Sequence, residues 1–143
     1  MAAFTATPAL VDVPTPHNCH IERGVLGANA VPGMWMYLDG NNGWKPAIGT
    51  SAAAAHTRGI VISDGFGSTA FVSGQTVDIV LKGRVVGFSG LTPGGSVYVS
   101  PDTAGSGDQS APTTGEYLCY GGYAWDAESI EVNPQVEIPA QVA

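Results

Sequence analysis

Charged residues are scarce in this sequence, and basic residues are the scarcest. Only 12% of the 143 residues are charged, and twelve acidic against five basic residues give a formal net charge of −7. Binding to nucleic acid relies on clustered cations that displace counterions from the phosphates. The basic residues are instead scattered along the chain: Arg23, Lys45, Arg58, Lys82 and Arg84. We therefore expect no nucleic-acid partner.

Long apolar runs are also missing. No stretch approaches the roughly 18 apolar residues of a membrane-spanning helix. The first residues, Met1–Thr5, lack the basic residues and apolar core of a signal peptide. A hydrophobic fraction of 44% nevertheless suits a packed core and argues against disorder. These features predict one folded domain with no membrane partner.

Cysteine is rare, and it shows no metal-binding spacing. Cys19 and Cys119 lie far apart, which predicts two half-buried thiols, with a single disulfide as the alternative. His17 and His20 flank Cys19, but a zinc site needs four ligands and His56 is the one histidine left. We expect no metal and no cofactor.

Catalytic motifs are absent as well. The sequence has no nucleophile elbow, zinc-protease motif, phosphate loop or dinucleotide fingerprint. Asp126, Glu128 and Glu131 are the closest set of carboxylates, and a glycosidase would need two acids facing across a cleft. The expectation is a protein that is not an enzyme.

Stretches long enough for a helix are the last feature that is missing. Twenty glycines and ten prolines interrupt the chain, and the longest stretch free of both is residues 123–133. An average helix needs about 11–12 residues. We therefore predict an all-β fold, a small antiparallel β-barrel or sandwich of about eight short strands, with extended N- and C-terminal arms and at most one short helix.

What is present fits that fold. Alternating and β-branched runs predict strands over residues 34–38, 44–47, 59–63, 76–81, 84–88, 96–100, 117–120, 123–125 and 129–132. Asp39–Gly43 predicts a hairpin marked by Gly40 and Gly43, and Lys82-Gly83 predicts a turn between two strands. Thr50–Arg58 has the best helix propensity in the chain.

The two ends differ from the middle. Prolines and spaced apolar residues predict an extended arm over residues 1–18, a β-barrel domain over 19–133 and a tail over 134–143. Frayed termini are the alternative to arms that pair with a partner's sheet edge. We expect the N-terminal arm to be disordered in the isolated protein, so that its deletion leaves the melting temperature nearly unchanged.

Aromatic residues allow two interpretations. Three tryptophans and five tyrosines would suit a carbohydrate-binding surface, but filling of a small barrel core is favoured. Trp35 lies between Met34 and Met36, so by strand alternation either it or they face outward.

One segment carries a family resemblance. Residues 83–100, in which Gly90-Leu91-Thr92-Pro93-Gly94 leads into Val97-Tyr98-Val99-Ser100, resemble a segment of tailed-phage structural proteins. Upstream, Leu38-Asp39, Trp44–Ala47 and Gly59–Ile62 are similar to head-decoration (cement) proteins, including the lambda type. The likeness covers residues 24–133, and β-domains of tail and fibre proteins share much of it.

The resemblance implies a capsid decoration protein, a homotrimer on the outer surface of a phage head. Its partners would be the major capsid protein and itself, and it would be made in the host cytoplasm and reside in the virion. The N-terminal arm occupies the end that orders on the capsid in the lambda type, so the implied capsid-binding residues are Phe4, Leu10, Val11, Val13, Pro14 and Pro16. A tail or fibre β-domain, or a carbohydrate-binding module, is the alternative.

Overall fold

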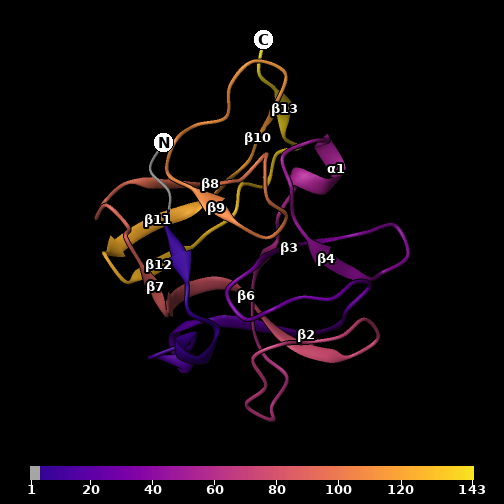
Figure 1. Cartoon of the computed structure of the whole chain (residues 1–143), viewed down its shortest axis with the longest axis vertical. Helices are drawn as coiled ribbons and strands as arrows, with labels where there is room; N and C mark the ends of the chain where they lie inside the picture. The colour runs from indigo at the N-terminus through magenta and orange to yellow at the C-terminus, as the bar shows by residue number, and fades with distance from the viewer. Residues whose placement is uncertain (1–3) are drawn as a thin grey trace.

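The computed structural model describes residues 4–143, and strands dominate it (Figure 1). Strands hold 41% of the residues and helices 7%, which confirms the all-β prediction. The strands are β1 (Thr5–Ala6), β2 (His20–Val25), β3 (Trp35–Leu38), β4 (Trp44–Pro46), β5 (Gly59–Ser63), β6 (Thr76–Val86), β7 (Phe88–Ser89), β8 (Ser96–Val99), β9 (Gly107–Asp108), β10 (Tyr117–Leu118), β11 (Tyr120–Asp126), β12 (Ser129–Val132) and β13 (Ala140–Gln141). No helix in this part of the chain is long and apolar enough to cross a bilayer.

Nine strands form one antiparallel sheet that curls into a half-barrel. Its order is β4-β3-β5-β6-β12-β11-β8-β9, and β2 also pairs with β6. Figure 1 shows β3 and β4 on one side of the molecule, β11 and β12 on the other, and β6 between them. Two small pairs, β1 with β7 and β10 with β13, complete the architecture.

The turn predicted at Lys82-Gly83 is wrong, because β6 runs through it as one strand of eleven residues. The first part of β6 pairs with β2 and β5, and residues from Gly83 to Val86 pair with β12. Gly83 has a φ of 127°, and a Cβ there would collide with Cys19. Glycine thus lets the strand bend and change partners without reversing.

The hairpin predicted at Asp39–Gly43 is confirmed by the pairing of β3 with β4. Asp39 Oδ1 accepts hydrogen bonds from the backbone N–H groups of Asn41 and Gly43, both at 2.8 Å. Those bonds, together with Lys45, lower the pKa of Asp39. The positive φ of the turn, 61°, belongs to Asn42 and not to a glycine. Asparagine tolerates this conformation better than most residues.

The central strands are buried on both sides. In β3, Trp35 belongs to one hydrophobic cluster and Met36 to another, and in β5 the neighbours Ile60 and Val61 divide in the same way. Strand alternation had suggested that one side of β3 faces outward, but both Trp35 and Met36 are at most 1% exposed. The second side is covered by loop residues such as Phe71.

The helix-prone segment forms a helix, and the cysteines match expectation only in part: both are free thiols, but Cys119 is fully buried where a half-buried thiol was expected. Helix α1 spans Ala52–Ala55, and Ser51 Oγ caps it by accepting a hydrogen bond from the Ala54 N–H at 3.2 Å. Cys19 is half-buried, Cys119 is fully buried, and both are free thiols.

The N-terminal segment does not extend away from the barrel, which corrects the expectation of a free arm. Phe4 contacts Phe88 edge to face at 5.9 Å between ring centroids, and β1 pairs with β7. Asp12 and Val86 exchange backbone hydrogen bonds, and Val13 is only 6% exposed. The ends of β6 and β7 offer unpaired backbone groups, and this segment satisfies them.

The C-terminal tail is also held at its end. Strand β13 pairs with β10, and Pro139 is buried. Val136 and Ile138 before it remain 85% and 74% exposed. The tail is therefore anchored while it presents apolar side chains to solvent.

Candidate functional site

The six residues predicted to bind a capsid divide into two groups. Phe4, Val11 and Val13 pack against the larger hydrophobic cluster and are used within the molecule. The other three are exposed: Leu10, Pro14 and Pro16. Only the outward side of the segment remains open to a partner, with Leu10 at 64% exposure.

A loop that the sequence interpretation missed presents the most exposed large apolar side chain. Phe66 lies between β5 and β6 and is 89% exposed. Its flanking residues, Gly65 and Gly67, have φ values of 86° and 75°, which glycine adopts without strain. An aromatic residue between two glycines was the sequence signal that would have identified this loop.

The base of the loop is fixed by a buried carboxylate. Asp64 is 3% exposed, and its Oδ1 accepts a hydrogen bond from the Phe66 N–H at 2.8 Å. Its Oδ2 accepts from Gln75 Nε2 at 2.7 Å, which ties the two sides of the loop together. Hydrogen bonds from Ser68 and from the Phe66 N–H lower the pKa of Asp64. The tip is thus exposed although its base is held by several hydrogen bonds.

The Phe66 loop adjoins the N-terminal segment. A cleft of about 140 Å³ is lined from both, by Pro8, Val11, Gly67 and Ser68 among others. We call the exposed residues Leu10, Phe66 and Val72 the apolar end; Val72 is 61% exposed. No charged residue occurs from Gly65 to Thr76. Such a surface suits contact with an apolar protein surface better than contact with ions or lipid headgroups.

A second surface is built on the outer side of the sheet. Backbone register aligns Ser96 of β8, Tyr123 of β11, Glu131 of β12 and Arg84 of β6 in one row across four strands. Trp125 follows Tyr123 at a register shift in β11, and their rings lie 6.1 Å apart. A bulge of this kind redirects a side chain, here toward β12.

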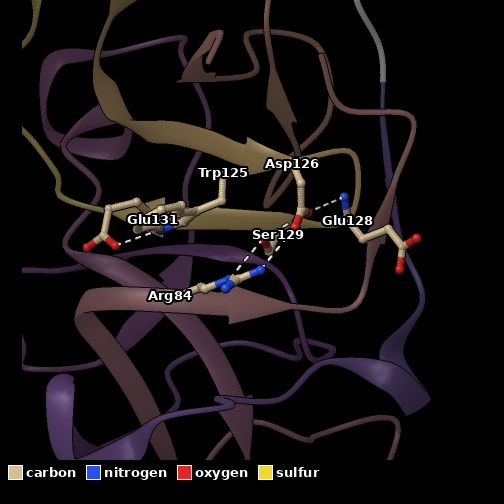
Figure 2. A network of polar contacts seen from close by, with 6 residues as sticks. All are labelled: Arg84, Trp125, Asp126, Glu128, Ser129 and Glu131. Atoms are coloured by element: carbon tan, nitrogen blue, oxygen red, sulfur yellow. Dashed lines mark hydrogen bonds and ion pairs between the residues drawn. The ribbon is translucent and has the colours of Figure 1, made fainter. Parts of the chain in front are cut away.

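Polar contacts hold Trp125 in place (Figure 2). Its Nε1–H donates to Glu131 Oε1 at 2.9 Å, and the Arg84 guanidinium lies 5.4 Å from the ring centroid. Arg84 is held in turn by Asp126, at 3.0 Å, and by Ser129 Oγ, at 3.1 Å. The indole remains 50% exposed. We call Arg84, Tyr123, Trp125, Asp126 and Glu131 the aromatic face.

The three carboxylates considered for catalysis lie in or beside this network. Hydrogen bonds from the Glu128 N–H and from Ser129 lower the pKa of Asp126. Glu131 is engaged with the indole N–H of Trp125. Both contacts orient the aromatic face, and the lowered pKa of Asp126 is opposite to the raised pKa that the acid of a glycosidase needs.

The core-filling prediction for tryptophan is confirmed for two of the three residues. Trp35 and Trp44 are 1% and 9% exposed, whereas Trp125 faces solvent.

In comparisons with known proteins, no family model, no curated protein and no solved structure matches the chain. A function is therefore proposed from the apolar end and the aromatic face themselves.

Proposed function

We propose that this chain is a structural decoration (cement) protein of a phage head, which binds the outer surface of the capsid through its apolar end. The observation that carries the proposal is Phe66, 89% exposed on a loop whose base is fixed by Asp64. Leu10 is 64% exposed on the N-terminal segment, which shares a cleft with this loop. Exposed apolar side chains on neighbouring segments are typical of a protein that functions bound to another protein.

The fixed loop favours binding. A side chain presented by a rigid loop loses less conformational entropy on association than one on a mobile arm. Burial of one phenyl ring contributes about 2–3 kcal/mol, which is weak for a single contact. A homotrimer on a repeating lattice would engage three apolar ends at once, so that modest contacts add up to stable attachment.

The composition supports the same role. A chain with a net charge of −7 and few cations avoids the packaged DNA of a virion. The role of the N-terminal segment differs from that expected of a free arm. Phe4 and Val13 fix the segment to the barrel, and Leu10, Pro14 and Pro16 face the capsid. A tail or fibre β-domain is the second candidate, since the same apolar end would suit a partner there.

A pull-down from virions of the native source tests the proposal. Wild-type protein is expected to retain the major capsid protein, and Phe66→Ser is expected to lose it by roughly tenfold or more. Ile138→Ser is the matched control, because Ile138 is 74% exposed in the C-terminal tail, just before β13, and is not one of the residues of the apolar end. Retention of tail or fibre proteins in place of the capsid protein would support the second candidate and contradict the first. Equal capsid binding by Phe66→Ser would contradict the role given to the apolar end.

A further inference from the structure

Trp125 is a large side chain left half exposed although its position is fixed. The core holds Trp35 and Trp44, so the fold buries tryptophan where it can. Trp125 instead lies at a β-bulge, with its N–H bound to Glu131 and its ring beside Arg84 (Figure 2). A fixed indole with an exposed ring surface suits stacking of a ligand, because its neighbours already restrict the side chain and little conformational entropy is lost on binding.

Glu131 beside the indole can still form hydrogen bonds. Glu131 uses Oε1 for the indole, which leaves Oε2 as an acceptor. Arg84 lies over one face of the indole and is bound to Ser129 and Asp126, so the opposite ring face is the one left for a ligand. An apolar ring face beside a carboxylate acceptor matches a ligand that has C–H faces and hydroxyl groups together.

Tyrosines extend this surface along β11 and onto β8. Tyr98 and Tyr120 contact edge to face at 6.3 Å, and Tyr123 contacts Trp125. Tyr120 lies opposite Tyr98 and Tyr123 lies opposite Ser96 in the pairing of β11 with β8, so the three phenols lie along one side of these strands. A row of this kind offers several aromatic contacts and hydroxyl groups to an extended ligand.

From these contacts we infer that the aromatic face binds a neutral oligosaccharide, with one sugar ring stacked on the face of Trp125 opposite Arg84 and its hydroxyl groups bonded to Glu131. Asp126, Glu128 and Glu131 outnumber the single cation Arg84 here. Like-charge repulsion therefore disfavours sulfated or sialylated glycans and nucleic acid. The inference is independent of the capsid proposal, which rests on other residues.

The test is a titration of the full chain with neutral hexasaccharides of glucose, mannose and N-acetylglucosamine, beside a sialylated glycan. Binding to every variant is measured by isothermal titration calorimetry, and in the wild type the NMR shift of the Trp125 indole N–H locates the ligand. At least one neutral hexasaccharide is expected to bind with a Kd below about 1 mM. Trp125→Ala is expected to weaken binding at least about tenfold, and Glu131→Gln several-fold.

Controls separate binding from folding. Phe66→Ala removes an exposed aromatic side chain outside the aromatic face and should leave the affinity unchanged. Glu131→Gln retains an acceptor for the indole, so it tests ligand contact even if Trp125→Ala lowers stability. The inference is overturned if no neutral hexasaccharide binds, if Trp125→Ala binds as well as wild type, or if the sialylated glycan is the preferred ligand.

Discussion

Val13→Ala is the most direct test of how the N-terminal segment sits. Val13 is 6% exposed and belongs to the larger hydrophobic cluster. The substitution removes two buried methyl groups, each contributing about 0.8 kcal/mol, and leaves a small cavity. We expect the free energy of unfolding to fall by about 1.5–3 kcal/mol.

Urea denaturation followed by tryptophan fluorescence measures this change, because Trp35 and Trp44 become exposed on unfolding. With a slope of about 2 kcal/mol per molar urea, the midpoint should fall by about 1 M. Leu10→Ala is the matched control on the same segment, since Leu10 is 64% exposed. A surface truncation of this kind should change stability by no more than about 0.5 kcal/mol.

The two variants together distinguish a docked segment from a free arm. A docked segment gives a large effect for Val13→Ala and almost none for Leu10→Ala. If both midpoints stay within about 0.2 M of wild type, the segment is free in solution and the packing described for Val13 is refuted. Rapid amide exchange at Val86, whose N–H bonds to Asp12 O at 2.9 Å, would lead to the same conclusion.

Three further predictions follow from local geometry. Asp39→Ala should destabilise the protein near pH 7. Because the pKa of Asp39 is lowered from 3.8, its contribution to stability is present above about pH 3.8 and is lost as pH falls through the lower folded-state value. The urea midpoints of variant and wild type should therefore converge in acid. Gly59→Ala should lower stability by at least about 2 kcal/mol, since its Cβ would collide with a backbone carbonyl of β6. The control is Gly40→Ala, which should be nearly neutral in thermal melts because its Cβ meets none of the described atoms within 4 Å. Burial raises the pKa of Cys119 to about 11, so a thiol reagent at pH 8 should label half-buried Cys19 well before Cys119. The free energy of unfolding should also fall as pH rises from about 9 to about 11. Equal labelling rates for the two cysteines would argue against the burial of Cys119.

Local features of the fold could be predicted because their causes are local. The Asp39–Gly43 hairpin and the short helix within Thr50–Arg58 depend on residues within a few positions of each other, and both are present. The continuity of β6 could not be predicted in this way. Lys82-Gly83 has the composition of a turn, and the pairing of β6 with β2 before this point and with β12 after it makes the chain bend there without reversing.

For the candidate surfaces, too, local sequence features could be predicted, and features that depend on tertiary packing could not. Spaced apolar residues marked the N-terminal segment, but they did not reveal that Val13 faces the core, which depends on the open ends of β6 and β7. Trp125 was grouped with the core tryptophans because composition does not separate them. Its exposure follows from strand alternation in β11, where Ala124 is buried and Tyr123 and Trp125 lie on the opposite side.

The sharing of β6 between both halves of the sheet has a consequence for biosynthesis. Its partners come from β2 and β5 before it in the chain and from β12 nearly fifty residues after it. Val85, near the C-terminal end of β6, therefore emerges from the ribosome well before the strand that pairs with it. Until β12 is made, this apolar strand has an unpaired edge, which is the condition under which nascent β-proteins associate with one another. Folding should thus be slow and completed only late in synthesis, because most of its contacts join distant parts of the chain.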